Sequence, residues 1–201
     1  MTATEQSKPV LRRREVVARI LRDRKDALAI TSLGNPTFDV ASAGDCAQNF
    51  YLWGAMGGAV MVGMGVALAQ PEKRVFVFVG DGEMMMGIGS LATVACHCPN
   101  NLTIVVIDNE HYAETGMQPA HAGRGVSITS VATAVGFTAS HLVRTAAQLE
   151  DVIDTLYKHD GPVLVGVKVT TDPEPTSLPP RDGPYLRSRF REALMGAESH
   201  R

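Results

Sequence analysis

Three runs of apolar residues constrain the fold of this chain more than any other feature. Residues 75–79 read VFVFV, residues 102–107 read LTIVVI, and residues 163–169 read VLVGVKV. A strand with one face in water alternates apolar and polar residues, whereas a strand covered on both faces is apolar almost throughout. The three runs therefore predict central strands of a mostly parallel sheet with helices on both faces.

The segments between these runs have the patterns of helices and short strands. Residues 11–26 place apolar side chains at helical spacing, and residues 58–69 are small and apolar, which suits a buried helix. We expect further helices at residues 84–96, 130–135, 145–157 and 185–195, short strands at 27–31 and 142–143, and a long loop at 108–125. Gly34-Asn35-Pro36 is expected to break the chain after the first short strand.

Alternating strands and helices predict an α/β fold, a three-layer sandwich with a mostly parallel sheet. The chain is long enough for one well-packed domain. We expect that domain at residues 31–170, preceded by a helical segment at 1–30 and followed by a proline-rich arm at 171–201 that includes one short helix.

Composition argues against several classes of function. The formal net charge is −2, and no basic cluster suggests binding to nucleic acid. The polar N-terminal residues do not resemble a signal peptide, and the apolar stretch 54–69 is too short and rich in glycine to span a membrane. An odd number of cysteines, three, fits a reducing compartment. We expect a cytoplasmic protein.

The residues that follow two of the apolar runs suggest a metal site. Asp81 lies between two glycines after the first run, and Asn109 follows the second. If these strands are neighbours, the two side chains lie side by side. A carboxylate and an amide oxygen suit a hard cation such as Mg²⁺, which phosphate oxygens can also bind.

A nucleotide-binding loop explains the same segment less well. The dinucleotide fingerprint needs a glycine three residues after Gly82, and Met85 stands there instead. No Gly-Lys-Ser or Gly-Lys-Thr sequence is present, so the phosphate-binding loop of many ATPases is absent from the sequence.

Gly80-Asp81-Gly82 and Asn109, 28 positions after Asp81, resemble the motif of enzymes that bind thiamine diphosphate (ThDP). The resemblance implies a ThDP-binding fold in which Asp81, Asn109 and the backbone carbonyl of His111 bind Mg²⁺. Gly82, Glu83 and Tyr112 would lie around the cofactor in the same site.

Trp53-Gly54-Ala55-Met56-Gly57 resembles the segment with which ThDP decarboxylases hold the middle of the cofactor. The resemblance implies that the carbonyl of Gly54 accepts a hydrogen bond from the pyrimidine amino group. Met56 would wedge between the two rings of the cofactor, and Gly57 would belong to the same binding segment.

Residues 49–57, 87–93 and 115–119 are similar to the two-subunit sulfopyruvate and phosphonopyruvate decarboxylases. The resemblance implies a subunit of a hetero-oligomer that decarboxylates a small 2-oxo acid. A partner subunit would bind the pyrimidine ring and carry the glutamate that activates it. Glu83 and Glu114 differ from what this family leads us to expect, and we expect Glu114 to move protons in the reaction.

Other functions remain open at this stage. A ThDP-dependent carboligase or a transketolase-like half-subunit would use the same cofactor site, and Gly-Asp-Gly-Glu at residues 80–83 also resembles the transketolases. A subunit that binds ThDP for regulation, without turnover, is an alternative of another class.

Overall fold

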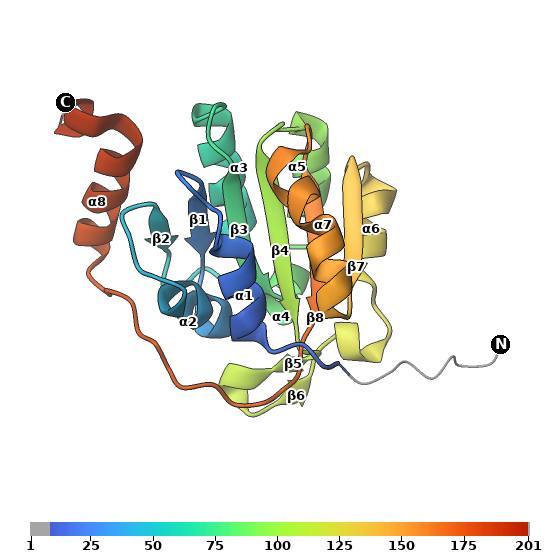
Figure 1. Ribbon diagram of the computed structural model, residues 1–201. Coiled ribbons are helices and arrows are strands. Elements are labelled where there is room, and N and C mark those ends of the chain that lie inside the picture. The colour runs from blue at the N-terminus through green and yellow to red at the C-terminus, as the bar shows by residue number, and fades with distance from the viewer. Residues whose placement is uncertain (1–8, 201) are drawn as a thin grey trace.

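The computed structural model describes residues 9–200, which form a six-stranded parallel sheet between two layers of helices (Figure 1). The strands lie in the order β2-β1-β3-β4-β8-β7, and every neighbouring pair is parallel. Their bounds are β1 Leu28–Thr31, β2 Asn49–Tyr51, β3 Val75–Gly80, β4 Leu102–Asp108, β7 Ala139–Val143 and β8 Val163–Lys168. The predicted α/β sandwich with a mostly parallel sheet is confirmed.

The sheet is buried on both faces because alternate residues of its central strands enter two separate cores. In β3, Phe76 and Phe78 pack in the first core, whereas Val75, Val77 and Val79 pack in the second. Helices α1 Arg13–Leu21, α2 Gly34–Ser42 and α7 Ala146–Lys158 contribute to the first core. Helices α3 Ala59–Ala69, α4 Asp81–Met86, α5 Ser90–His97 and α6 Ile128–Val135 contribute to the second. This two-sided burial is why the strands read as continuous apolar runs.

The last helix, α8 Gly183–Met195, lies beyond β2 at one edge of the sheet (Figure 1). Asp182 caps it by accepting a hydrogen bond from the backbone N–H of Tyr185. Phe190 packs on Phe50 of β2, with ring centroids 5.1 Å apart. A 3₁₀ turn, η3 Gly196–His200, follows α8.

The N-terminal helix is packed against the sheet. Val16, Val17 and Ile20 of α1 are buried in the first core, and the boundary that we expected between residues 30 and 31 falls inside β1. Helix α1 and the strands therefore share one core. The first part of the helical segment expected at 1–30, residues 1–8, lies outside the described residues.

One predicted helix is in fact two. Residues 84–96 were expected to be continuous, but α4 ends at Met86 and α5 begins at Ser90. The break lies at Gly87, whose backbone packs against Gly57. A Cβ at position 87 would lie 2.3 Å from the Gly57 carbonyl oxygen. Close packing of two backbones, which glycine alone permits, separates the helices.

Helix α2, strand β2 and the short elements within the loop 108–125 were not predicted. Gly34-Asn35-Pro36 does end the preceding strand, but it also forms the first turn of α2, where proline is tolerated because its missing N–H has no helical partner. The short edge strand β2 was not predicted. The expected loop at 108–125 contains a small antiparallel pair, β5 His111–Tyr112 and β6 Gln118–Pro119, and two 3₁₀ turns, η1 Ala113–Thr115 and η2 Ala122–Arg124.

Candidate active site

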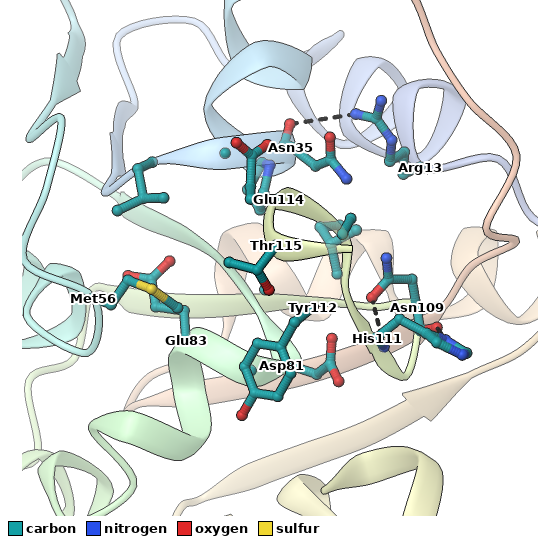
Figure 2. A pocket seen from close by; sticks show the side chains of 17 residues that line it. Arg13, Asn35, Met56, Asp81, Glu83, Asn109, His111, Tyr112, Glu114 and Thr115 are labelled. Carbon is teal, nitrogen blue, oxygen red and sulfur yellow. Dashed lines mark hydrogen bonds between the residues drawn. The ribbon is translucent and has the colours of Figure 1, made fainter. Parts of the chain in front are cut away.

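The two residues of the predicted metal site lie at the ends of neighbouring strands. β3 and β4 are paired in parallel, with Gly80 opposite Ile107. Asp81 follows Gly80 as the first residue of α4, and Asn109 follows the end of β4. Both residues line one cavity at the carboxyl edge of the sheet (Figure 2). The spacing of the motif in sequence therefore corresponds to proximity in the fold.

The cavity has a volume of about 120 Å³. It is bounded by the start of α1, the turn between β1 and α2, the loop before α3, the ends of β3 and β4, and the segment β5–η1 that follows β4. Its lining residues are Arg13, Leu33, Gly34, Asn35, Pro36, Met56, Gly80, Asp81, Gly82, Glu83, Ile107, Asn109 and residues 111–115.

Asp81 is buried without full compensation of its charge. It is 1% exposed, and its Oδ2 has no hydrogen-bond partner among the described residues. Burial, and after it the nearby charge of Asp108, raises the pKa of Asp81 to about 7. A buried carboxylate of this kind is stabilised by a bound cation.

Glu83 is a second buried acid in the cavity. Its Oε1 also lacks a hydrogen-bond partner among the described residues. Burial raises the pKa of Glu83 to about 7, although the hydroxyl of Ser32 and backbone groups of Gly57 and Gly80 act to lower it. Figure 2 shows Glu83 and Met56 at the same cavity.

The turn after β4 holds Asn109 and His111 close together. The Asn109 Oδ1 accepts a hydrogen bond from the backbone N–H of His111 at 3.0 Å. The Nδ1 of His111 lies 2.8 Å from the backbone carbonyl oxygen of Asn109. Glu110 between them adopts a left-handed conformation with φ of 64°. Such a conformation is uncommon for a residue with a side chain and occurs often at functional sites.

Tyr112 explains the need for glycine at position 82. A Cβ at Gly82 would lie 2.3 Å from Cε1 of the Tyr112 ring, so the ring packs directly on the backbone that follows Asp81. The Tyr112 hydroxyl lies 3.5 Å from Nδ1 of His121. The tyrosine thus forms part of the cavity wall and restricts the backbone next to the predicted metal ligand.

The loop before α3 brings Met56 to the cavity through an unusual backbone. Trp53 and Ala55 have φ values of 54° and 56°, and Gly57 has a φ of 87°. Met56 lines the cavity, whereas Gly54 and Gly57 belong to the same loop without lining it. A Cβ at Gly57 would lie 2.8 Å from the backbone nitrogen of Gly87, so this end of the loop is held against the start of the α4–α5 connection.

Glu114 lines the cavity from the turn η1. Its Cγ is 3.3 Å from the position that a Cβ on Gly34 would take, so the side chain rests on the turn between β1 and α2. Figure 2 shows Glu114 beside Asn35 at the cavity. Its position permits contact with a ligand in the cavity.

Sequence reasoning missed the wall formed by Leu33, Gly34 and Asn35. The available signal was that strand β1, like β3 and β4, ends at the carboxyl edge of a parallel sheet, where ligands usually bind. It also missed Arg13, which lines the cavity and forms a buried ion pair with Asp39. No pattern in the sequence connects α1 with this edge.

A second set of charged residues lies at the same edge. Lys168 at the end of β8 contacts Asp108 at 2.8 Å and Glu110 at 2.6 Å. Burial acts to lower the pKa of Lys168, but its contacts with the two acids outweigh burial and raise it. Asp108 is therefore neutralised within the chain, unlike Asp81.

No group of three or more His, Cys, Asp or Glu side chains among residues 9–200 is arranged to hold a metal. The predicted ligand set differs from such a cluster, because it combines one carboxylate with one amide and one backbone carbonyl. Within the same residues, no helix has the length and apolar character to cross a membrane.

Comparison with known proteins identifies a shared domain. Residues 33–167 match the family described as thiamine pyrophosphate enzyme, C-terminal TPP binding domain. The beta subunit of sulfopyruvate decarboxylase from Methanothermobacter thermautotrophicus is 36% identical over 188 residues, which cover 94% of this chain and 98% of that subunit. Phosphonopyruvate decarboxylase from Streptomyces viridochromogenes is 39% identical over 145 residues, which cover 72% of this chain and 36% of the relative.

A solved structure shares the fold. Benzoylformate decarboxylase from Polynucleobacter necessarius superposes with a TM-score of 0.70 at 17% sequence identity, over 87% of this chain and 36% of that protein. The chain corresponds to about a third of that larger protein.

Proposed function

Because this chain belongs to the thiamine pyrophosphate enzymes, whose C-terminal TPP-binding domain its sequence matches, we propose that it is one subunit of a Mg²⁺- and ThDP-dependent decarboxylase. Its substrate is a small 2-oxo acid, as the names of the sulfopyruvate and phosphonopyruvate decarboxylases suggest. A partner subunit that binds the pyrimidine ring completes the active site.

The observation that carries this proposal is the pairing of Asp81 with Asn109 in one buried cavity. Asp81 has an unpartnered, buried carboxylate oxygen among the described residues, and Asn109 offers an amide oxygen from the neighbouring strand end. This donor set fits Mg²⁺, and the cation would in turn bind diphosphate. The residues therefore fit the cofactor that the family binds.

In this proposal Asp81, Asn109 and the backbone carbonyl of His111 hold Mg²⁺. Gly82, Glu83 and Tyr112 line the cavity around the cofactor. When bound, ThDP supplies the nucleophilic carbon and the electron sink that decarboxylation of a 2-oxo acid requires.

The loop before α3 holds the middle of the cofactor. Met56, which lines the cavity, would wedge between the two rings of the cofactor. The carbonyl of Gly54 would accept a hydrogen bond from the pyrimidine amino group, and Gly57 allows the loop to approach Gly87. The left-handed residues of this loop support a binding role, because strained backbone concentrates at ligand sites.

Glu114 moves a proton to or from the reacting substrate. It lines the cavity, and it belongs to a turn that directly follows the loop proposed to bind Mg²⁺. A carboxyl group in this position can donate or accept a proton if the substrate comes within hydrogen-bond distance.

The need for a partner is supported by the size of the cavity. Pockets for small molecules usually measure about 300–1,000 Å³, whereas this cavity measures about 120 Å³. The chain also corresponds to 36% of the Streptomyces relative, and its Methanothermobacter relative is named a beta subunit. The partner supplies the rest of the pocket, including the glutamate that activates the pyrimidine ring, in a hetero-oligomer.

The surface of one helix layer also suits a partner. Helices α3, α5 and α6 contain no Asp, Glu, Lys or Arg, and Met61, Leu68 and Met86 are exposed on or next to them. Helices α1 and α7 of the other layer carry many charged residues. Exposed apolar surface of this kind is typical of contacts between subunits. The free cysteines Cys46, Cys96 and Cys98 are consistent with a reducing, cytoplasmic location.

Calorimetric titration of ThDP into the full chain, with and without Mg²⁺ and with and without the co-expressed product of the adjacent gene, tests the proposal. Binding that needs Mg²⁺ and tightens with the partner, followed by CO₂ release from sulfopyruvate or phosphonopyruvate, would support it. Release of CO₂ with a hydroxy-ketone product in place of an aldehyde would indicate a carboligase, transfer of a ketol unit to an aldehyde without CO₂ release a transketolase-like enzyme, and binding without turnover a regulatory subunit. No ThDP binding in either sample would refute the proposal.

A further inference from the structure

An extended segment at residues 171–182, here called the strap, joins β8 to α8 across the end of the sheet that carries the cavity. Figure 1 shows it leaving β8, passing the β5–β6 pair and reaching α8 on the far side of β2. Both ends of the strap are fixed. The backbone N–H of Thr170, just before it, donates to the Leu11 carbonyl at 2.8 Å, and Asp182 caps α8.

The strap is also attached at its middle to the start of α1. Glu174 forms an ion pair with Arg12 at 2.9 Å, and the Pro175 carbonyl accepts a hydrogen bond from Arg14 Nη2 at 2.5 Å. These two contacts set the path of a proline-rich segment that has no regular secondary structure of its own. The strap therefore passes the cavity in a defined position.

Near its end the strap contacts Trp53, at the beginning of the loop that carries Met56. The indole Nε1 donates a hydrogen bond to the Pro180 carbonyl at 2.7 Å. The guanidinium carbon of Arg181 lies 4.9 Å from the centroid of the indole ring, which is a cation–π contact. Trp53 is thus bound by both a backbone and a side-chain group of the strap.

The loop that Trp53 begins needs such external support. Its backbone takes left-handed conformations at Trp53, Ala55 and Gly57. For the two residues with side chains, these conformations cost free energy and persist only when surrounding contacts determine them. The far end of the loop is held by the contact between Gly57 and Gly87, and the backbone N–H of Trp53 donates to the Ser32 carbonyl at 2.8 Å. The strap holds the side chain of Trp53 at the near end of the loop.

We propose that the strap positions the loop 53–57 for cofactor binding, with Trp53 and Arg181 as positioning residues. Pre-organised loops bind more tightly because less conformational freedom is lost on binding. The effect of the strap on the loop is independent of the ligand, whereas its effect on ThDP affinity rests on the proposed function.

Hydrogen exchange in the full chain without cofactor tests the contact itself. Trp53→Phe removes the indole N–H, Arg181→Ala removes the cation, and Arg187→Ala is a matched control at an exposed position of α8. The backbone amides at positions 52, 53 and 58 are hydrogen-bonded and report on the loop in every variant.

We expect the exchange rate at these amides to rise about fivefold in Trp53→Phe and about threefold in Arg181→Ala. These factors correspond to the loss of one hydrogen bond and of one exposed cation–π contact, respectively. Exchange in β3 and in the Arg187→Ala control should not change. Unchanged loop exchange in both variants, or an equal rise in β3, would overturn the proposal, because the contact would then have no specific effect on the loop.

The fluorescence of Trp53 gives a second reading, because it is the one tryptophan in the sequence. Arg181→Ala should shift its emission to longer wavelength and increase quenching by acrylamide, whereas Arg187→Ala should leave both unchanged. Identical spectra and quenching in Arg181→Ala and the unaltered chain would count against the proposed role of Arg181.

Titration of ThDP in the presence of Mg²⁺ then separates the two proposals. We expect the unaltered chain to bind and the two strap variants to bind about three- to fivefold more weakly. If the unaltered chain binds no ThDP either alone or with its partner subunit, the proposed function fails, and hydrogen exchange still decides whether the strap holds the loop. If all variants bind ThDP equally, positioning of the loop for the cofactor is refuted.

Discussion

Asp81 and Asp108 lie at the ends of neighbouring strands, both buried, yet their charges are balanced in different ways. Asp108 accepts a hydrogen bond from the backbone N–H of Glu110 at 3.1 Å and contacts the ammonium group of Lys168 at 2.8 Å. Asp81 has no ion-pair partner within 4 Å among the described residues, and its Oδ2 has no hydrogen-bond partner there. Burial raises the pKa of both acids, to about 7 for Asp81, and Lys168 opposes the rise at Asp108.

The difference supports the proposal that Asp81 binds a ligand, whereas Asp108 has a structural role. Ionisation of Asp108 is supported by a cation that belongs to the chain, so this acid needs nothing else. Ionisation of Asp81 costs free energy in the chain alone, and a bound cation would remove that cost. In the proposed function, the two aspartates have different roles although both stand at the end of an apolar strand.

The largest effect is expected from removing the ammonium group of Lys168, which pairs with Asp108. Lys168→Met leaves the buried Asp108 and the half-buried Glu110 without a partner, and removing one member of a buried ion pair typically costs about 3–5 kcal/mol. Denaturant unfolding at pH 7 measures the free energy of unfolding. Lys158→Met is the matched control, since Lys158 pairs with Asp154 on the surface, and it should change stability by less than about 1 kcal/mol. Equal stabilities of the two variants would contradict the structural role of Asp108.

Asp81, the proposed ligand-binding acid, should make the free energy of unfolding depend on pH. The pKa of Asp81 is about 7 in the folded chain, above the value of about 3.9 expected when unfolded. Between these values the folded state holds more protons than the unfolded state, so the free energy of unfolding falls as pH rises from about 4 to about 7. Asp81→Asn removes this contribution, which is up to about 4 kcal/mol at 1.36 kcal/mol per pKa unit.

Unfolding curves of the chain without cofactor, recorded from pH 5 to pH 8, measure this difference. The stability of Asp81→Asn should exceed that of the unaltered chain, and the gap should widen with pH. Glu83 contributes a similar slope in both proteins, because burial also raises its pKa to about 7. A difference in the free energy of unfolding that stays constant with pH would show that the fold does not raise the pKa of Asp81.

The contrast between the two acids was only partly predictable from sequence. The apolar runs predicted β3, β4 and β8 to within one or two residues, because each is buried on both faces. Adjacent apolar strands also predicted that Asp81 and Asn109 lie together. That Lys168 neutralises Asp108 depends on β8 lying next to β4, and strand order across a sheet has no local signal in the sequence.

The walls of the cavity were harder to predict for the same reason. The contact of Glu114 with Gly34 joins positions far apart in the chain, and the burial of Arg13 against Asp39 depends on how α1 packs on α2. The strand β2 is short and lies at the edge of the sheet, so its residues do not form an apolar run. Local patterns determine strands and helices, whereas contacts between distant segments appear only in the folded chain.

A smaller effect is expected on cofactor affinity when the ligand-binding acid is changed. Asp81→Asn should weaken Mg²⁺-dependent ThDP binding by at least about 100-fold, because loss of a metal ligand should exceed the roughly 10–100-fold that outer-shell changes cost. Calorimetric titration at fixed Mg²⁺ measures the dissociation constant. Asn109→Ala should also weaken binding strongly, since it removes the second side-chain ligand. Retained affinity in Asp81→Asn would remove the basis of the proposed metal site.

The smallest effect is expected from the equivalent change at the structural acid. Asp108→Asn keeps an oxygen that can accept the hydrogen bond from the backbone N–H of Glu110, and Lys168 retains its contact with Glu110 at 2.6 Å. The turn that carries Asn109 and His111 should therefore keep its shape, and the dissociation constant for ThDP should change by less than about threefold, the scale of a weakened neutral hydrogen bond. The same titration, run beside Asp81→Asn, measures both. If Asp108→Asn loses affinity as strongly as Asp81→Asn, Asp108 acts on the metal site despite its ion pair, and the division between the two acids is wrong.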